Sequence, residues 1–388
     1  TLIVYCCSLF IAAHSFLNTS DHLSLLCKEI FTSRDCKTVD FRLKRTKCKA
    51  LILNVLAPHF VDRLLNDIGD KKFSIIIDES TDIAVSKLLA VCIRYFSTEM
   101  NKIVSTFLGI IELEKCDANS IVQGIKELLN SLKLDPKKIQ GVGTDNASVM
   151  CGVNNGVYVK MKSEFRNNSI ILIRCICHSL QLALSHATEE TLPRNIEFMI
   201  RETYKWFSHS TLRRLAYKEI YNTINCGNDP LQIPEMCNTR WVSIEPAVNR
   251  ILEQYNELTL HFNLARHQDH YYTAEMLYNM YKDPANKIYL TYIKSFLNEV
   301  QRANKLFESE NADPTKLLES LTHLVRSLSG RILNPSARID PLKCRIDGHI
   351  DPSPYLGYSV ENELKNSNLS VEIKDNVRGR CVNFIKKT

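Results

Sequence analysis

The sequence predicts an α/β fold in which a mixed sheet with the order β-β-β-α-β-α-β is followed by a long all-helical half. Two observations support this. Short apolar runs rich in β-branched residues, separated by turn residues, recur between residues 73 and 175. From about residue 176 onward, apolar residues recur at helical spacing almost to the end of the chain.

The composition indicates a globular protein with more than one unit. The chain has 388 residues, more than a single core usually organises. Hydrophobic residues make up 45% and charged residues 24%, and the formal net charge of +6 permits contact with nucleic acid without requiring it. Its 14 scattered cysteines favour reduced, buried thiols over a disulfide framework. No apolar run reaches the roughly 20 residues of a membrane span, so we expect no membrane contact.

Residues 1–70 are predicted to form an N-terminal helical region. Segments 1–16 and 21–31 have helical spacing, and the apolar start lacks the basic flank of a signal peptide. A basic cluster then precedes a further helical pattern, and it either contacts phosphates or forms a solvated helix face. The cluster comprises Arg42, Lys44, Arg45, Lys47 and Lys49.

Residues 71–177 are predicted to form the sheet. Strands at 73–78, 88–96 and 104–112 have short connections and therefore form an antiparallel meander. The remaining elements are a helix at 119–132, a strand at 139–144, a helix at 147–165 with glycine interruptions at Gly152 and Gly156, and a strand at 170–175. Crossover connections place the first strand in the centre of the sheet, beside the fourth.

Asp78 and Asp145 follow two of these strands directly. The run Ile75–Ile77 before Asp78 is typical of a strand buried on both faces. If the first and fourth strands are neighbours, the two carboxylates lie at one edge of the sheet. Paired carboxylates of this kind hold the divalent metal of phosphoryl-transfer sites. The alternative, which these residues leave open, is that each Asp caps the following turn or helix.

Residues 178–388 are predicted to be helical, with a loop at 334–358. The predicted helices are 178–190, 194–208, 211–225, 244–265, 270–282, 286–308, 314–329 and 370–386. Within 194–218, basic residues alternate with aromatic ones, which fits either a phosphate-binding face or a solvated helix with a buried aromatic side. The basic members are Arg194, Arg201, Lys205, Arg213, Arg214 and Lys218, and the others are Tyr204, Trp206 and His209.

Cys175, Cys177 and His178 form a further cluster of potential ligands. Tetrahedral zinc needs four ligands, and no second pair lies nearby in the sequence. A catalytic Cys–His pair is also disfavoured, because Cys177 and His178 are adjacent and point apart on a strand or a helix. A structural or DNA-positioning role fits this cluster better.

Four motifs together resemble the hAT transposase superfamily, above all the transposase-derived proteins that accompany BED or MYM-type zinc fingers. They are FSIIIDESTD at 73–82, GVGTDNAS at 141–148, CICHSLQLAL at 175–184 and NTRWVS at 238–243. Their order and spacing agree with that superfamily, and the segments 45–50 and 355–357 extend the resemblance over nearly the whole chain.

The resemblance implies a ribonuclease H-like core, interrupted by a large all-α insertion, that cuts and transfers DNA ends in the nucleus. Asp78 and Asp145 match the first two catalytic acids, which hold Mg²⁺ or Mn²⁺. Cys175 and His178 match a motif near the active site. Trp241 matches a residue that stacks on a flipped base, beside the DNA-contacting Arg240. A homo-oligomer is implied for the full-length protein.

One departure from the family concerns the third carboxylate. The family supplies it from a Ser-Glu-Arg-x-Phe-Ser type motif in a C-terminal dimerisation segment, and neither this motif nor a preceding BED finger occurs here. The contexts of Glu361, Glu363 and Glu372 do not match it. We therefore expect a catalytically incomplete DNA-binding relative, whose two Asp residues hold metal weakly.

The alternative function is a domesticated, non-enzymatic nuclear scaffold that binds DNA or protein, and the sequence leaves open whether the chain is an enzyme. A generic ribonuclease H-type nuclease is a third interpretation. It fits less well, because that task does not need the helical insertion.

Overall fold

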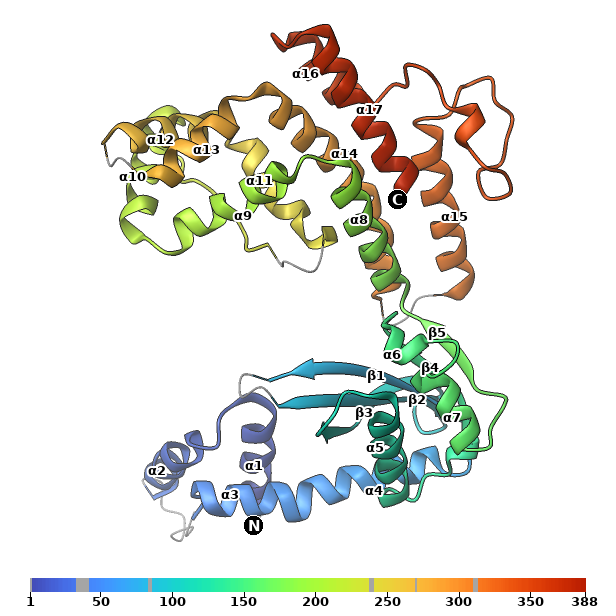
Figure 1. The fold of residues 1–388 in the computed structure, drawn as a ribbon. Helices are drawn as coiled ribbons and strands as arrows, with labels where there is room; N and C mark the ends of the chain where they lie inside the picture. The colour runs from blue at the N-terminus through green and yellow to red at the C-terminus, as the bar shows by residue number, and fades with distance from the viewer. Residues whose placement is uncertain (1, 33–41, 83–85, 237–240, 269–270, 310–312) are drawn as a thin grey trace. The chain divides into compact units, whose positions relative to one another are not determined.

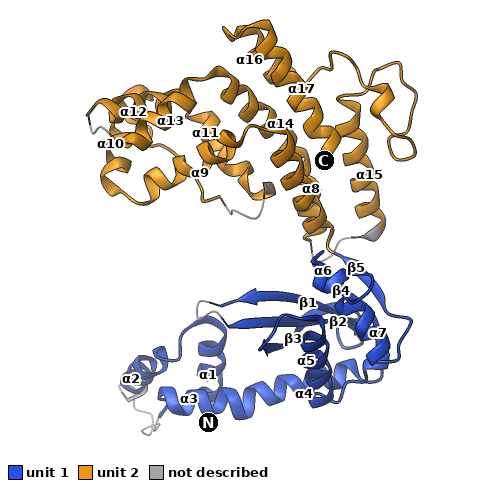
Figure 2. Cartoon of the chain, in the orientation of Figure 1, with its two compact units in different colours: residues 1–174 blue, residues 175–388 orange. Residues whose placement is uncertain are grey.

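The computed structural model describes residues 2–32, 42–82, 86–236, 241–268, 271–309 and 313–388 (Figure 1). The chain forms two compact units, Thr1–Arg174 and Cys175–Thr388 (Figure 2). The first, unit 1, contains the sheet and the N-terminal helices, and the second, unit 2, is helical.

Unit 1 is built on a five-stranded mixed sheet with the order β3-β2-β1-β4-β5. Its strands are β1 (Phe73–Thr81), β2 (Lys87–Ser97), β3 (Lys102–Leu113), β4 (Ile139–Thr144) and β5 (Ile171–Arg174). The first three strands pair antiparallel, whereas β1–β4 and β4–β5 pair parallel. This order confirms the predicted meander and places the first strand beside the fourth.

One face of the sheet carries the core of unit 1. The side chains of Ile75, Ile93 and Ile125 are fully buried in this core. The covering helices include α4 (Ala57–Ile68), α5 (Ala118–Ser131) and α7 (Val157–Glu164). Asp117 is the N-cap of α5, and its carboxylate accepts hydrogen bonds from the backbone N–H groups of Asn119 and Ser120.

The opposite face of the sheet is open, so the prediction that β1 is buried on both faces was wrong. Along β1, buried and exposed side chains alternate, and Ile76 is 40% exposed. The same face carries further exposed apolar side chains from the other strands, at Phe96, Ile103, Phe107, Ile110, Ile171 and Ile173. The apolar run suggested burial on both faces because both faces of the strand are hydrophobic, although the described helices of unit 1 cover only one of them.

The N-terminal helices of unit 1 are α1 (Leu2–His14), α2 (Thr19–Thr32) and α3 (Arg45–Leu51). They enclose a small core of their own around Ile11, Leu43 and Cys48. A π-helical turn, Ile52–Leu56, joins α3 to α4. Pro58 lies in the first turn of α4, where its missing N–H would break a regular helical ladder.

Two predicted helices are divided in the structure. The segment 147–165 forms α6 (Ser148–Cys151) and α7, and the break lies between Gly152 and Gly156, the two glycines predicted to interrupt this helix. The segment 244–265 forms α11 (Glu245–Glu253) and α12 (Tyr255–Gln268). At the break, the buried Gln254 amide accepts from Tyr217 Oη and donates to the carbonyl of Leu231. These are tertiary contacts that helical periodicity does not predict.

The remaining helices of unit 2 surround a large aromatic and aliphatic core that includes Phe262, Tyr292 and Phe296. They are α8 (Ile176–Thr191), α9 (Arg194–Ser208), α10 (Thr211–Ile224), α13 (Tyr272–Lys282), α14 (Pro284–Phe307), α15 (Pro314–Gly330), α16 (Tyr358–Asn366) and α17 (Val371–Lys387). Short 3₁₀ turns lie at Trp241–Ile244 and Asp347–His349 in unit 2 and at Pro136–Lys138 in unit 1. Of these helices, α16 was not predicted. None of the described helices is both long and apolar enough to cross a membrane.

Candidate metal and nucleic-acid site

The parallel pairing of β1 and β4 brings the two predicted acids to one edge of the sheet. Ile76 and Gly143 are partners in this ladder, and Asp78 and Asp145 each lie two residues further along. Strand β1 was predicted to end at Asp78, but it continues to Thr81 in register with β2. Asp78 therefore projects from the middle of a paired strand on the same face as Ile76.

The two carboxylates differ in their surroundings. Asp78 is exposed, and the structure shows no partner for its carboxylate among the described residues. Asp145 is half-buried, and its Oδ1 accepts a hydrogen bond from the Ala147 backbone N–H at 3.1 Å. This contact is an Asx turn, so the capping alternative accounts for one oxygen of Asp145. It does not account for Asp78.

Arg174 is an additional charged residue at this edge that no sequence motif distinguishes. It ends β5 as the ladder partner of Thr144, the last residue of β4. Its guanidinium lies within hydrogen-bonding range of the Cys151 thiol, which itself donates to the Asp145 carbonyl at 3.1 Å. Burial raises the pKa of Cys151, so this thiol stays protonated. The sequence could have indicated Arg174 only by its position, because it lies at the carboxyl end of a strand that pairs parallel with β4.

Glu361 and Glu363, two of the glutamates considered for the third carboxylate, form ion pairs within unit 2. Glu361 accepts two hydrogen bonds from the Arg378 guanidinium, at 2.6 and 2.8 Å, and this contact lowers the pKa of Glu361. Glu363 forms an ion pair with Lys287 at 2.9 Å. Within the described ranges, no cluster of three or more His, Cys, Asp or Glu side chains is placed to hold a metal ion.

The Cys-x-x-His motif lies where α8 begins. Cys175 is the exposed N-cap residue of α8, and His178 is half-buried in its first turn. Cys177 approaches the carbonyl of Asn304 at 3.9 Å, and burial raises the pKa of its thiol to about 11. One turn further on, Gln181 Oε1 accepts the backbone N–H of Val242 at 2.9 Å. The tertiary fold thus joins the helix of this motif to the turn that begins at Trp241.

The structure does not test the predicted DNA contacts of Arg240 and Trp241. Arg240 lies outside the described residues. Trp241 opens the turn Trp241–Ile244, and only the backbone of this residue is described.

The basic residues predicted to contact phosphate have several protein partners. On α9 and α10, three of them pair with acids: Arg201 with Glu197, Lys205 with Glu202 and Lys218 with Asp229. Arg213 instead stacks on the ring of the buried Trp206, at 3.8 Å from its centroid. These contacts fit the interpretation of a solvated helix with a buried aromatic side. At the start of α3, Lys44, Lys47 and Lys49 are exposed.

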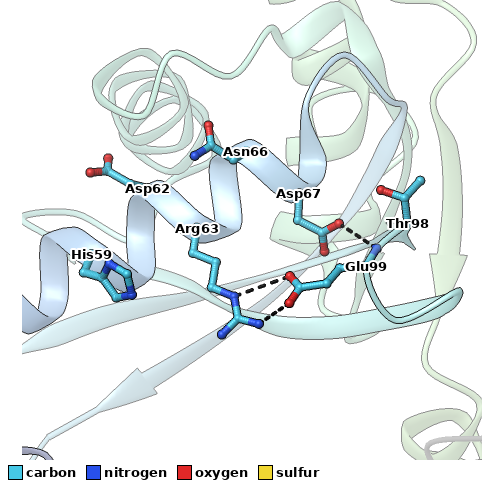
Figure 3. Close-up of a pocket in the computed structure, with 7 residues that line it drawn as sticks. All are labelled: His59, Asp62, Arg63, Asn66, Asp67, Thr98 and Glu99. Atoms are coloured by element: carbon cyan, nitrogen blue, oxygen red, sulfur yellow. Dashed lines mark hydrogen bonds and ion pairs between the residues drawn. The ribbon is translucent and has the colours of Figure 1, made fainter.

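A polar hollow of about 550 Å³ lies between α4 and the β2–β3 turn (Figure 3). Arg63 spans it and forms a two-point ion pair with Glu99. Asp67 accepts hydrogen bonds from Tyr95 Oη at 2.9 Å and from the Glu99 backbone N–H at 3.4 Å. Burial and this bond to Asp67 raise the pKa of Tyr95 to about 12. Through these contacts, Asp67 and Glu99 connect α4 to the sheet.

Comparison with known protein families identifies part of unit 1. Residues 28–156 match the model of the family DUF4371, described as "ZMYM1/FAM200, RNase-like domain". The match covers β1–β4 and contains both Asp78 and Asp145. The five-stranded mixed sheet agrees with that description. Residues 28–156 are therefore an RNase-like domain, and the match supports its derivation from a transposase.

Proposed function

We propose that this chain is a hAT transposase-like protein that binds DNA at the edge of its RNase-like sheet, with Asp78 and Asp145 as the ligands of Mg²⁺ or Mn²⁺. The observation that carries the proposal is the parallel register of β1 and β4, which sets two acids at one edge. DNA in the nucleus is the partner and compartment that this function requires.

The two side chains fit such a metal in chemical terms. Carboxylate oxygens are the donors that Mg²⁺ prefers, and this ion is commonly held by one or two carboxylates together with substrate phosphates. Asp78 has both oxygens available among the described contacts, and Asp145 has one beyond its Asx turn. Because the described residues place no third acid beside these two, we expect weak metal binding that strengthens when a phosphodiester is present.

A bound metal would supply Lewis-acid stabilisation of charge on the phosphoryl oxygens. The protein's part is to orient the two carboxylates, which the paired backbone of β1 and the Asx turn after β4 both support. Arg174 at the end of β5 adds a cation at this edge that can contact a phosphate. We expect strand cleavage to be slow or absent, in keeping with catalytic incompleteness.

The decisive experiment measures binding and nicking of a hairpin and a terminal-repeat DNA with Mg²⁺, with Mn²⁺ and with EDTA. We expect metal to strengthen DNA binding, and both Asp78→Asn and Asp145→Asn to abolish that increase. Asp70→Asn is the matched control, because Asp70 is 98% exposed and precedes the other end of β1. Metal-independent binding that is equal in all three variants would refute the metal role.

A second candidate function is a non-enzymatic scaffold that binds DNA or protein. The open apolar face of the sheet favours it, because exposed apolar patches often mark protein contacts. In that case DNA binding falls steeply with salt but does not depend on metal, and no nicking occurs at any metal concentration.

A further inference from the structure

Strand β3 forms one edge of the five-stranded sheet of unit 1 (Figure 1). It is 12 residues long and pairs with β2 on its inner side. On its outer side, no described segment forms a backbone hydrogen bond with it. The outer N–H and C=O groups of an edge strand can pair with a further strand, so this edge is able to accept one.

Strand β3 lacks most of the features that protect sheet edges from such pairing. These features are short length, charged side chains, proline and β-bulges. No charged residue and no proline occurs from Ile103 to Ile111. By contrast, the opposite edge strand, β5, has only four residues and ends in Arg174. The protective feature that β3 does have is a bulge at Leu108, which has no partner on β2 and leaves Lys102–Phe107 as the longer regular segment.

Exposed apolar side chains lie symmetrically about Ser105, an exposed residue in this segment. Ile103 and Phe107 lie two residues to either side of it, on the open face of the sheet, and each is more than half exposed. Met100 in the β2–β3 turn and Ile110 after the bulge lie five residues to either side, and each is likewise more than half exposed. Between residues 98 and 113, all of them described, no other large apolar side chain is exposed. A surface with this symmetry is complementary to a second copy of itself.

We propose that residues 103–107 of β3 pair antiparallel with the same residues of a second copy of the chain, about a two-fold axis at Ser105. Ile103 then lies opposite the partner's Phe107, and an aromatic ring beside a β-branched side chain is a favourable cross-strand pair. The symmetry forms this pair twice, and Met100 meets the partner's Ile110 beyond each end of the ladder. The two sheets thereby join into one. Because the ladder is short, the dimer is weak and forms in the micromolar range.

Pairing at the edge leaves Asp78 accessible, whereas stacking of two open faces would cover it. Asp78 is exposed on the open face, and a second sheet packed over that face would bury its carboxylate without a described partner. Strand β2 separates β3 from β1. A strand added beside β3 therefore lies away from Asp78 and Asp145, and this dimer does not depend on metal or DNA at those residues.

Arg94 is a charged side chain close to this two-fold axis. It lies on β2, is exposed, and donates from Nη1 to Ser105 Oγ at 2.9 Å. The axis at Ser105 brings two copies of this arginine toward each other, so they repel, and dissolved salt screens the repulsion. The dimer should therefore become stronger as the salt concentration rises, whereas an association of two copies bridged by DNA becomes weaker.

The test is sedimentation equilibrium of the nuclease-treated full chain at micromolar concentrations, in low and in high salt. We expect the average mass to rise with concentration from 44.5 kDa toward twice that value, and more steeply in high salt. Ile103→Lys and Phe107→Lys each place a charge in the ladder and should weaken dimerisation by about tenfold or more. The matched control is Ile173→Lys on β5, because Ile173 and Phe107 are 57% and 58% exposed, and it should leave the dimer intact.

Complementary charges test the register of the pairing. Ile103→Glu and Phe107→Lys should each weaken the dimer when studied alone. An equal mixture of the two variants should form a heterodimer, because the introduced acid of one copy lies opposite the introduced base of the other. The unchanged Phe107 and Ile103 keep their apolar pair in this heterodimer. A mixture of Phe107→Lys with Ile173→Glu should not recover the dimer, because Ile173 lies outside the ladder.

Three results would overturn this proposal. One is a mass of 44.5 kDa at every concentration, which would mean that a second copy does not occupy the edge. Another is a dimer that Phe107→Lys leaves intact, or that Ile173→Lys weakens equally, since this indicates stacked open faces. The third is a dimer that salt dissociates, since DNA then bridges the copies. Asp78→Asn and Asp145→Asn should leave the dimer unchanged, so a failure of the metal site and a failure of this interface give different outcomes.

Discussion

Ile76 of β1 and Gly143 of β4 face each other as partners in a parallel ladder, and a methyl group added at Gly143 would lie 3.4 Å from Ile76 Cγ1. This is an ordinary van der Waals distance. The parallel ladder through this pair sets the register that places Asp78 and Asp145 at one edge. The same register puts Gly143, and not a larger side chain, beside the exposed Ile76 on the open face of the sheet.

Substitution of Gly156 by alanine should destabilise unit 1, in contrast to the same change at Gly143. A Cβ at Gly156 would lie 2.6 Å from the backbone N and O of Gly152, which cannot move without shifting the α6–α7 turn. We expect Gly156→Ala to lower the free energy of unfolding by about 1–3 kcal/mol. Gly143→Ala should cost less than about 1 kcal/mol. Urea unfolding followed by circular dichroism measures the stability of both variants. Equal losses of stability would contradict the close approach of Gly156 to the Gly152 backbone.

The two faces of the sheet should respond differently to truncation. Ile93 is fully buried beneath the helices, so Ile93→Ala should cost about 2–5 kcal/mol through lost burial and a cavity. Phe107 is 58% exposed on the open face, so Phe107→Ser should cost less than about 1 kcal/mol. Thermal unfolding of the full chain measures the stability of the two variants against that of the wild type. A large loss for Phe107→Ser would mean that this face is covered in solution.

The ion pair between Glu361 and Arg378 should stabilise unit 2. Both side chains are about three-quarters buried, and two hydrogen bonds join them. We expect Glu361→Gln to cost about 1.5–3 kcal/mol, because it leaves the guanidinium without its charged acceptor.

The exposed pair of Glu190 and Lys387 provides the comparison, and Glu190→Gln should cost much less than Glu361→Gln because solvent screens the exposed pair. Chemical denaturation of both variants distinguishes these expectations. If Glu361→Gln instead weakened Mn²⁺ binding without loss of stability, Glu361 would be a metal ligand and not a structural partner.

His261 should make unit 2 less stable in mild acid. Its Nε2 accepts the Trp206 indole N–H at 3.0 Å, and burial, with a smaller effect of Arg213, lowers its pKa from 6.5 to about 4. The stability that the neutral ring contributes is complete above pH 6.5 and falls as the pH drops to 4, since the unfolded chain gains a proton first. The loss over this window is roughly 3 kcal/mol.

Unfolding of the wild-type chain and of His261→Gln, measured at several pH values between 7.5 and 4, tests this expectation. Glutamine keeps a hydrogen-bond acceptor but does not titrate in this range. The difference in stability between the two proteins should therefore change with pH. A constant difference would show that His261 titrates at an ordinary pKa in the folded protein.

Local patterns determined much of unit 1. The short apolar runs and the turn residues between 73 and 175 indicate the five strands, and short connections followed by crossovers favour one order, with β1 beside β4. The positions of Asp78 and Asp145 at one sheet edge follow from that order. These features are predictable because they depend on residues close in the chain and on general rules of sheet topology.

Tertiary contacts decided which face of the sheet is covered and where a long helical pattern is divided. The sequence cannot tell that only one face of β1 is covered, since Ile75 and Ile76 are equally apolar and the covering helices come from distant segments. It cannot tell that Gln254 breaks a helix, because the groups it bonds belong to other segments. The contact of Arg174 with Cys151 likewise depends on side chains that folding brings together, and local periodicity carries no information about such contacts.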